Sequence, residues 1–439
     1  MGIHDVKRHE RGPFLSRVST DIIRSSQSAG ARLLDRLGIF PPLAWGYFGL
    51  LLFMIGDGVE SGYLAPFLLA KGISQSEVAA IFTLYGATAA VSAWISGALS
   101  DLWGPRRVMC CGLGIWAVFE VVFLLTVASG AGYSMLLTSY ALRGFGYPLF
   151  AYGFLVWITV ATPERRLGTA VGWFWFAFTG GLPTLGSLLA SFTVPLIGAY
   201  RTLWTSLGLV ILGGFIALLG TDEPTGTQRL APASENPLKT VLSSVTIAWR
   251  IPKTTIGCVV RVINTSPQFG FFVFLPVFFT TTVGLSLIAW LRLLSAIFLS
   301  NIVWNLLFGV IGDKLGWRRT VALCGGVGSA VTTLLLYYTP RLFGANYTLC
   351  LVAGVMYGAT LAGYVPLSAL MPSLAPQHKG AAMSMLNLGA GASAWVGPAI
   401  VGICLAPLGV GGVMWIFAVL YLISAALTLL LTLPSEEAQ

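Results

Sequence analysis

Long apolar segments alternate with short polar connections along most of the chain. Many of these segments run for about 20 residues or more, the length that an α-helix needs to cross the hydrocarbon core of a bilayer. Strands of a membrane β-barrel would instead alternate apolar and polar residues over about 10 positions. The Leu-, Gly- and Ala-rich runs lack that alternation, so the pattern predicts an all-α membrane protein.

Turn residues and charged pairs divide the apolar pattern into two sets of six predicted spans. We expect the first set near residues 43–70, 77–100, 106–128, 132–161, 166–192 and 199–220. After a hydrophilic stretch, we expect the second set near residues 253–282, 287–311, 317–339, 346–374, 378–405 and 409–433. The predicted organisation is therefore a basic tail (1–42), an N-terminal six-helix bundle (43–220), a linker (221–252), a C-terminal six-helix bundle (253–433) and a short tail (434–439).

The composition agrees with a membrane location. Of the 439 residues, 56% are hydrophobic and only 9% are charged, whereas charged residues make up about a quarter of soluble domains. The net charge of +9 would favour nucleic-acid binding if the basic residues formed one patch, but they lie mostly in the first tail and in alternate connections. Because cytoplasmic loops retain Lys and Arg, this distribution predicts cytoplasmic termini and no nucleic-acid partner.

Residue types that carry enzyme chemistry are sparse. The six Cys residues are scattered through apolar segments without a Cys-x-x-Cys pair. His4 and His9 lie in the tail and His378 lies at a predicted helix start, so the sequence indicates neither a metal site nor a cofactor. No nucleophile motif is present either, and we expect that the chain is not an enzyme.

Two segments of the chain repeat each other 212 residues apart. The first reads Gly97-Ala-Leu-Ser-Asp101-Leu-Trp-Gly104-Pro-Arg106-Arg107, and the second reads Gly309-Val-Ile-Gly-Asp313-Lys-Leu-Gly316-Trp-Arg318-Arg319. Both lie between the second and third predicted spans of their half. The repetition indicates an internal duplication, which in membrane carriers places a binding site between two related halves.

The repeated segment resembles the signature loop of the major facilitator superfamily. The string from Ala44-Trp-Gly-Tyr-Phe-Gly49 to Phe53-Met-Ile-Gly-Asp57-Gly58-Val-Glu60-Ser-Gly62 further resembles the polyol permeases, the ribitol and D-arabinitol transporters. The resemblance implies twelve membrane helices in two pseudo-symmetric six-helix bundles, a monomer in a bacterial inner membrane, and alternating access coupled to protons. The first copy departs from the family's pattern at Leu102 and Pro105, where basic residues are usual.

The resemblance also assigns a role to the charged residues of the repeat. It implies that Asp101, Arg107, Asp313 and Arg319 hold a cytoplasmic gate and favour the outward-facing state. The simpler alternative is that the Arg pairs of the two copies only set the orientation in the membrane.

Ionisable residues within predicted spans are the sharpest functional clue, because an unpaired charge facing lipid is costly. Asp57 and Glu60 are three residues apart on one helix face, and Arg143 lies at a similar depth in the fourth span. Two acids facing one Arg leave one negative charge uncompensated, so we predict that these three residues couple transport to a proton. The alternative is a fixed salt-bridge network that joins the first and fourth helices.

Three further charges lie within spans. The superfamily fold usually places the third helix at the periphery, so for Glu120 a structural hydrogen bond is the preferred interpretation over coupling. Arg292 lies close enough to a span end to reach the membrane surface. Arg261 lies deeper, and its half has no acidic residue at that depth, so we expect it to face water, backbone carbonyls or an anionic substrate.

Carboxamide and aromatic side chains predict where a sugar alcohol would bind. Carboxamides both donate and accept hydrogen bonds, as hydroxyl groups do, and aromatic rings pack against C–H faces. The candidate substrate-binding residues are Asn264, Gln268, Asn301, Asn305, Tyr364, Asn387, Trp173 and Trp395. Hydrogen bonds between helices and ordinary core packing are the competing explanations for each of them.

The sequence thus favours a secondary transporter, with proton-coupled symport of a pentitol such as ribitol or D-arabinitol as the leading hypothesis. An organic-anion carrier for a solute like 2-oxoglutarate remains open, because Arg143 and Arg261 could clamp two carboxylates. A sugar carrier of the same fold is a further alternative.

Overall fold

The computed structural model describes residues 34, 39–163, 166–230, 251–375 and 379–433. Most of the predicted tails and of the linker lies outside these residues. In the first half, the helices are η1 (Pro41–Leu43), α3 (Ala44–Gly58), α4 (Leu64–Ala70), α5 (Gln75–Trp103), α6 (Pro105–Ser129), α7 (Tyr133–Arg143), α8 (Gly146–Ala161), α9 (Leu167–Thr179), η3 (Gly180–Leu185), α10 (Gly186–Ile197), α11 (Ala199–Gly220) and η4 (Pro224–Thr227).

The second half repeats this order. Its helices are α14 (Pro252–Val277), η5 (Phe278–Thr282), α15 (Leu287–Leu315), α16 (Trp317–Thr320), η6 (Val321–Val327), α17 (Gly328–Phe343), α18 (Tyr347–Leu361), η7 (Ala362–Tyr364), α19 (Leu367–Leu374) and α20 (Lys379–Leu429). Gly409 interrupts α20 with a left-handed backbone (φ 65°), so this element contains the last two membrane helices.

The predicted helix count is confirmed. Within the described residues, ten helical stretches are long and apolar enough to cross a membrane. The last of them, Met385–Leu429, is interrupted at Gly409 and therefore holds two spans. The first span is divided between α3 and α4, and neither helix is long enough to cross a membrane alone. Together these elements give the twelve helices expected from the apolar pattern.

Two turns of the first half match turns of the second half residue by residue. Gly72 and Gly284 both have a positive φ, as do Gly104 and Gly316, and each pair is separated by 212 residues. At the same offset, the hydroxyl groups of Ser74 and Ser286 cap the starts of α5 and α15. Only Gly adopts such backbones at little cost, so the duplication seen in the sequence is preserved as backbone geometry.

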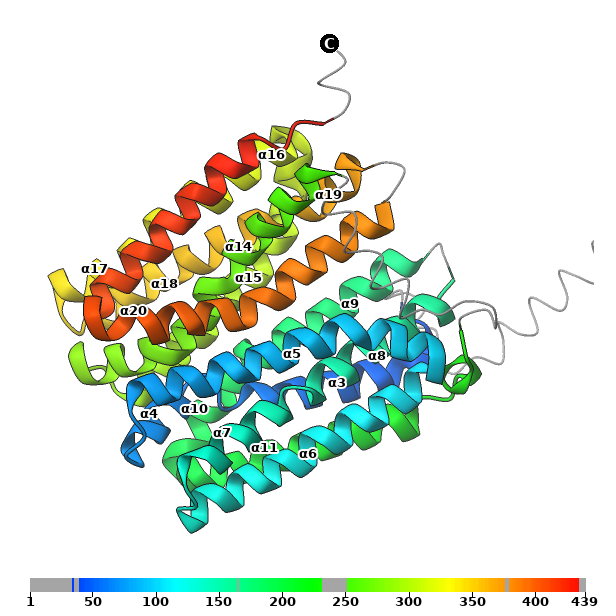
Figure 1. The fold of residues 1–439 in the computed structure, drawn as a ribbon, viewed down its shortest axis with the longest axis horizontal. Helices are drawn as coiled ribbons and strands as arrows, with labels where there is room; N and C mark the ends of the chain where they lie inside the picture. The colour runs from blue at the N-terminus through cyan, green and yellow to red at the C-terminus, as the bar shows by residue number, and fades with distance from the viewer. Residues whose placement is uncertain (1–33, 35–38, 164–165, 231–250, 376–378, 434–439) are drawn as a thin grey trace, which may run out of the picture.

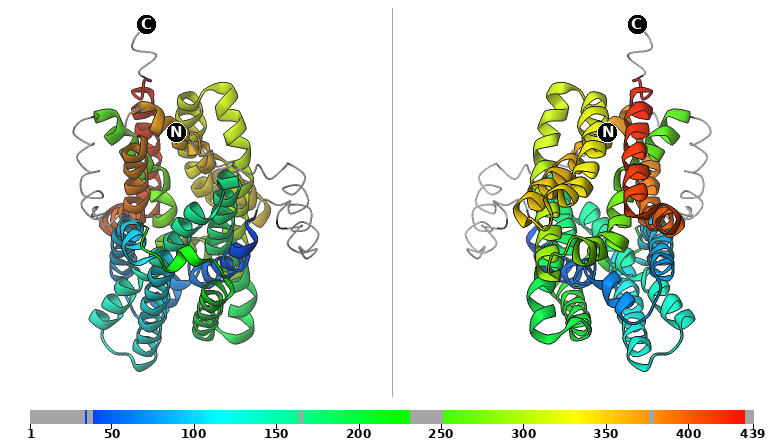
Figure 2. Two further views of the ribbon diagram at one scale, coloured as in Figure 1. Left: turned by 90° about the vertical axis from the view of Figure 1, so that its right-hand side faces the viewer. Right: turned by 90° about the vertical axis from the view of Figure 1, so that its left-hand side faces the viewer.

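The two halves form separate bundles that pack along one face. Figure 1 shows α14 to α20 above α3 to α11, and Figure 2 shows the same separation from both ends. We call the end where α11 stops and α14 begins the linker end, and the other the opposite end. Buried Leu, Phe, Val and Ala side chains fill each bundle, while many exposed apolar residues face outward, as expected for a protein surrounded by lipid.

The contacts between the bundles lie toward the opposite end. Hydrogen bonds that join the halves there run from Gln75 Nε2 to the Val273 carbonyl (3.1 Å), from Trp290 Nε1 to the Gly62 carbonyl (2.8 Å) and from Ser295 Oγ to the Thr184 carbonyl (2.9 Å). The approach of α5 to α20 is so close that a Cβ at Gly86 would lie 2.2 Å from the Ala394 carbonyl oxygen.

Candidate functional site

The first membrane helix is broken at the depth where its acids lie. Helix α3 ends at Gly58, and α4 starts at Leu64 after a short turn. A Cβ at Gly58 would lie 1.6 Å from the carbonyl oxygen of Leu182, so only Gly allows this approach of the turn to η3. The break leaves Asp57 on the last turn of α3 and Glu60 in the connection, with both side chains directed into the bundle.

Arg143 lies at the centre of a buried ion-pair network. Its side chain is fully buried at the end of α7, and its two terminal nitrogens bind Glu60 of the first helix and Glu120 of α6. The Glu60 carboxylate also accepts a hydrogen bond from the Tyr140 hydroxyl at 2.6 Å. The predicted meeting of Glu60 with Arg143 is therefore seen, whereas the participation of Glu120 was not predicted.

Asp57 has different partners. Its Oδ1 accepts hydrogen bonds from the Trp116 indole nitrogen at 2.6 Å and from the Tyr85 hydroxyl at 3.3 Å. In the described part of the chain it forms no ion pair, so Arg143 binds only Glu60 and Glu120. The two acids that the sequence placed on one face are thus chemically distinct.

Aromatic rings surround the guanidinium group. The Arg143 Cζ lies 4.3 Å from the ring centre of Tyr140, 4.9 Å from that of Trp116 and 5.2 Å from that of Tyr85. Ring faces attract cations and exclude water. The cage therefore encloses Arg143 beside its carboxylates and shields the network from lipid.

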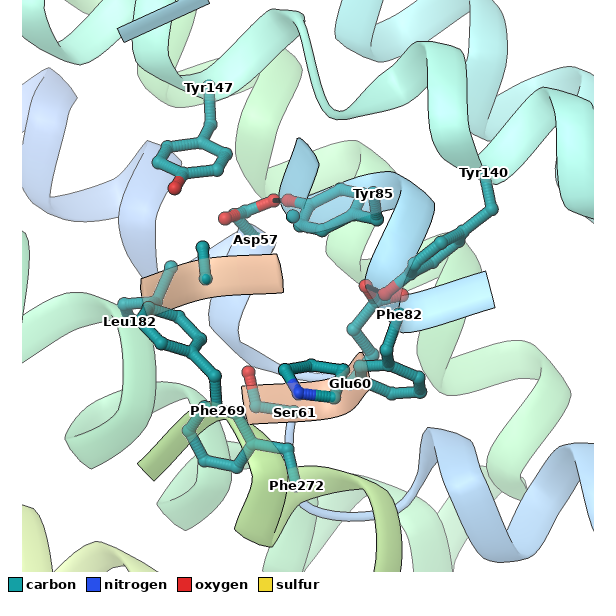
Figure 3. A pocket seen from close by; sticks show the side chains of 13 residues that line it. Asp57, Glu60, Ser61, Phe82, Tyr85, Tyr140, Tyr147, Leu182, Phe269 and Phe272 are labelled. Carbon is teal, nitrogen blue, oxygen red and sulfur yellow. Dashed lines mark hydrogen bonds between the residues drawn. The ribbon is translucent and has the colours of Figure 1, made fainter. Parts of the chain in front are cut away.

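A small cavity joins this network to the interface between the bundles (Figure 3). Its volume is about 50 Å³, enough for a few water molecules. Both Asp57 and Glu60 line it, together with Tyr85, Tyr140 and Tyr147. From the C-terminal bundle, Phe269 and Phe272 of α14 and Ala394 and Pro398 of α20 close the other side.

Arg261 lies nearer the linker end on α14. Its guanidinium group donates to the Asn264 side-chain oxygen, and its stem packs against α20 at Gly389. It interacts electrostatically with Tyr152 of α8, which belongs to the other bundle. Within the described residues it forms no ion pair, so this partly buried cation lies near the other bundle without a carboxylate partner.

A chain of aromatic contacts connects the two charged centres. The rings of Tyr85 and Tyr147 are 6.2 Å apart, those of Tyr147 and Phe178 are 6.3 Å apart, and those of Phe178 and Tyr152 are 6.0 Å apart. Tyr152 interacts electrostatically with Arg261. These four rings, which we call the aromatic wall, therefore extend from the acids toward the cation.

The structure does not bring the predicted carboxamides together. Asn301 donates to the Gly358 carbonyl at 3.2 Å and so joins α15 to α18, and Asn305 donates to Asn301 within α15. Asn264 is buried among α14, α18 and α20, where its amide donates to the Leu361 carbonyl. Gln268 is half-buried and Asn387 is exposed, and neither lines the cavity. A role in substrate binding stays a prediction for all five.

The predicted aromatic residues are likewise dispersed. The Tyr364 hydroxyl donates to Ser424 at 3.0 Å inside the C-terminal bundle, where the ring packs against Gly325. Trp395 is 39% exposed on α20, and Trp173 packs its ring edge against Phe176. None of these three lines the cavity.

The predicted gate residues lie at the linker end. The Asp101 backbone carbonyl accepts from the Leu230 amide at 2.9 Å, and the Asp313 carboxylate accepts from the Trp317 indole at 2.8 Å. Arg107 and Arg319 are exposed. Among the hydrogen bonds of the described residues, only the first copy binds the start of the linker, and the gating role of both copies stays a prediction.

Comparison with known proteins identifies the family. The model of the Major Facilitator Superfamily matches residues 46–311 and 257–439. The chain belongs to this superfamily. Superfamily relatives include the alpha-ketoglutarate permease of Bacillus subtilis, which is 47% identical over 93% of both chains.

Two further superfamily relatives come from Klebsiella pneumoniae. The D-arabinitol transporter is 37% identical over 88% of this chain and 92% of its own, and the ribitol transporter is 36% identical over 87% and 90%. The predicted resemblance to polyol transporters is confirmed. The chain is therefore a membrane transporter of small molecules and not an enzyme, and its relatives carry two different classes of solute.

Glu120 is the site residue whose partner sequence reasoning did not predict. A structural hydrogen bond was expected for it, and Arg143 donates one to its carboxylate. The available signal was the charge count itself. An acid deep in an apolar helix needs a buried cation, and Arg143 was the one at comparable depth in its bundle.

Proposed function

We propose that the protein is a proton-coupled carrier of an organic anion with two carboxylates, such as 2-oxoglutarate. The observation that carries this proposal is Arg261, a partly buried cation that interacts with Tyr152 of the other bundle and forms no ion pair within the described residues. A guanidinium group binds a carboxylate in a bidentate manner, and a cation held at this depth without a counter-ion favours an anionic ligand.

Arg143, which was expected to bind the second substrate carboxylate together with Arg261, is already occupied. Arg143 is bound by Glu60 and Glu120 and enclosed by three aromatic rings, so it is not free to hold a substrate carboxylate in this state. The remaining polar groups of the aromatic wall, Tyr147 and Tyr152, can donate hydrogen bonds to the second carboxylate. The proposed site therefore lies between Arg261 and the cavity.

For the proton, we propose Glu60 rather than Asp57. Glu60 both lines the cavity and binds Arg143, so a proton arriving from the cavity would compete with the guanidinium group for the same carboxylate. Asp57 also lines the cavity but is held by neutral donors. Release of the Glu60 contact would loosen α7 from the first helix and so link protonation to the shape of the interface.

The proposed orientation places the linker end in the cytoplasm of a bacterium, since the basic residues gather there. Contacts between the bundles lie toward the opposite end, and Asn387, one helical turn from the α5 contact at Gly391 in the direction of the linker end, is exposed. This arrangement favours a state open to the cytoplasm. On this proposal, Asp101, Arg107, Asp313 and Arg319 would form gate contacts when the linker end closes.

A pentitol is the second candidate substrate. It is supported by the similarity to the D-arabinitol and ribitol transporters over about nine-tenths of their lengths. In that case the hydroxyl groups of the solute would bind the tyrosines of the aromatic wall and the carboxamide of Asn264.

External pH in a lightly buffered, de-energised suspension of cells that express the protein separates the candidates. Addition of 2-oxoglutarate should make the medium more alkaline, and addition of ribitol or D-arabinitol should not. Alkalinisation by a pentitol alone would overturn the anion assignment and leave proton coupling intact. No response to any of the three would contradict proton coupling itself.

A further inference from the structure

We propose that Glu120 is the fixed counter-ion that allows Glu60 to exchange its proton, and that Arg143 shifts its contacts between the two carboxylates during each transport cycle. This inference rests on the proposed proton coupling and assigns a positioning role to a residue on α6. Glu120 does not contact the substrate path, since it is fully buried and does not line the cavity.

The network is asymmetric with respect to the cavity. Arg143 binds both carboxylates, but only Glu60 lies on the cavity wall, where water can deliver a proton. If Glu60 were the sole partner, its protonation would leave a guanidinium charge in the membrane interior without a counter-ion, which is strongly unfavourable. With Glu120 on its other side, Arg143 stays paired in both protonation states of Glu60.

Two buried polar atoms of the network lack a hydrogen bond in this state. Glu120 Oε1 and Arg143 Nε are buried and have no hydrogen-bond partner in the described structure. Buried polar atoms are usually paired, and an exception calls for an explanation. Glu120 therefore keeps a free acceptor oxygen, and a small shift of the guanidinium group toward α6 would strengthen its contact with Glu120 at the expense of the contact with Glu60.

The aromatic cage fits such a shift. Tyr140, Trp116 and Tyr85 present ring faces to the guanidinium group at 4.3 to 5.2 Å, and ring faces hold a cation without fixing its hydrogen bonds. Arg143 can therefore slide between carboxylates while remaining desolvated. The Tyr140 hydroxyl stays with Glu60, because it donates to Oε1.

The proton affinity of Glu60 then depends on every ionisable group around it. These groups are Asp57 and Tyr63 near the break in the first helix, Tyr85 on α5, Glu120 on α6, Tyr140 and Arg143 on α7 and Tyr147 on α8. Of these, Glu120 acts in two ways. It repels a negative charge on Glu60, and it draws Arg143 away from it, and both effects favour the protonated form of Glu60.

Glu120→Gln should therefore make Glu60 harder to protonate. In proteoliposomes that hold the purified protein, accumulation of 2-oxoglutarate under an inward proton gradient should move to lower external pH by about one unit, a tenfold higher proton concentration. Glu120→Asp keeps the charge but shortens the reach, so its midpoint should fall between those of the wild type and Glu120→Gln. Glu77→Gln, which changes a partly exposed acid in the first turn of α5, is the control and should not shift it.

The outcomes separate this inference from the proposed function. Suppose that the wild type accumulates 2-oxoglutarate and that Glu120→Gln and Glu120→Asp keep its pH midpoint, whatever their transport rates. Glu120 would then have a merely structural role, and this inference alone would be overturned. If Glu120→Gln does not fold, an unchanged midpoint in Glu120→Asp has the same meaning. A wild type that accumulates neither 2-oxoglutarate nor ribitol under the gradient would overturn proton coupling and this inference together.

Discussion

At the offset of 212 residues that relates the two bundles, Asp57 corresponds to Phe269 and Glu60 corresponds to Phe272. All four residues line the same cavity, so the acids of the first bundle face the phenylalanines that replace them in the second (Figure 3). The duplicated backbone has kept its turns and caps, while the side chains at the shared interface have diverged. At this cavity, the N-terminal bundle contributes buried acids, and the C-terminal bundle contributes an apolar surface that faces them.

The deep cations differ in the same way. Arg143 in the N-terminal bundle is saturated by two carboxylates, whereas Arg261 in the C-terminal bundle binds only the carboxamide of Asn264 among the hydrogen bonds of the described residues. A paired cation can respond to protons, and an unpaired one can respond to anions. On the proposed function, the N-terminal bundle would therefore respond to the proton and the C-terminal bundle would bind the anion.

The largest expected effect comes from removing the cation of the N-terminal bundle. Arg143→Gln leaves three buried carboxyl groups without a positive charge, and loss of one partner of a buried ion pair costs about 3–5 kcal/mol. Uptake should fall by about 100-fold or more, because no cation then competes with the proton for Glu60, and that factor corresponds to about 2.7 kcal/mol in the barrier to transport. Arg143→Lys should not rescue it, because Lys cannot bind both acids in a planar fork. Uptake by cells with matched membrane levels of protein checks this, and wild-type activity in either variant would contradict it.

Removing the cation of the C-terminal bundle should act on binding instead. Arg261→Gln loses a charge-assisted contact worth about 1.5–3 kcal/mol, so KM for 2-oxoglutarate should rise about 10- to 150-fold while the protein remains folded. Arg292→Gln, an exposed Arg that stacks on Phe192, is the matched control and should leave KM unchanged. An unaltered KM in Arg261→Gln would contradict the proposal that the C-terminal bundle binds the anion through Arg261.

The contact between the bundles can be tested at Gly86. A valine there would collide with the Ala394 carbonyl, so the opposite end should open and the linker end should close. In a background without native cysteines, labelling of Asn387→Cys from the linker side should slow about fivefold, which corresponds to about 1 kcal/mol. Gly114→Val, whose Cβ would meet open space on α6, should label at the normal rate. Faster labelling in Gly86→Val would contradict the assigned state.

The smallest expected effect concerns the carboxamides of α15. Asn301→Ala removes one hydrogen bond to the Gly358 carbonyl, and such bonds between membrane helices average about 0.6 kcal/mol. Thermal stability should fall slightly while KM for either solute stays the same. A tenfold rise in KM for a pentitol would instead support the carboxamides as ligands and sharpen the case for a polyol carrier.

The fold was predictable because it depends on local and periodic features. Apolar runs of membrane length, the linker and the repeat around Asp101 and Asp313 were enough for twelve helices in two bundles. The exact break after Gly58 was not predicted, because it depends on the approach of η3 from another part of the chain.

The site was predictable only in part. The ion pair of Glu60 with Arg143 followed from charge and depth, but depth alone does not say which face of α6 carries Glu120. The carboxamide cavity was not seen, since hydroxyl-binding side chains also satisfy backbone carbonyls of neighbouring helices, as Asn301 and Asn264 do.

The most direct test of the account compares net accumulation with exchange in proteoliposomes. Glu60→Gln cannot exchange a proton, so it should lose accumulation of 2-oxoglutarate under a proton gradient but keep exchange of internal for external 2-oxoglutarate, which needs no net proton movement. Asp57→Asn, which keeps an acceptor for Trp116 and Tyr85, should retain both. Accumulation by Glu60→Gln at the wild-type level would contradict the central claim that the N-terminal bundle couples transport to the proton through Glu60.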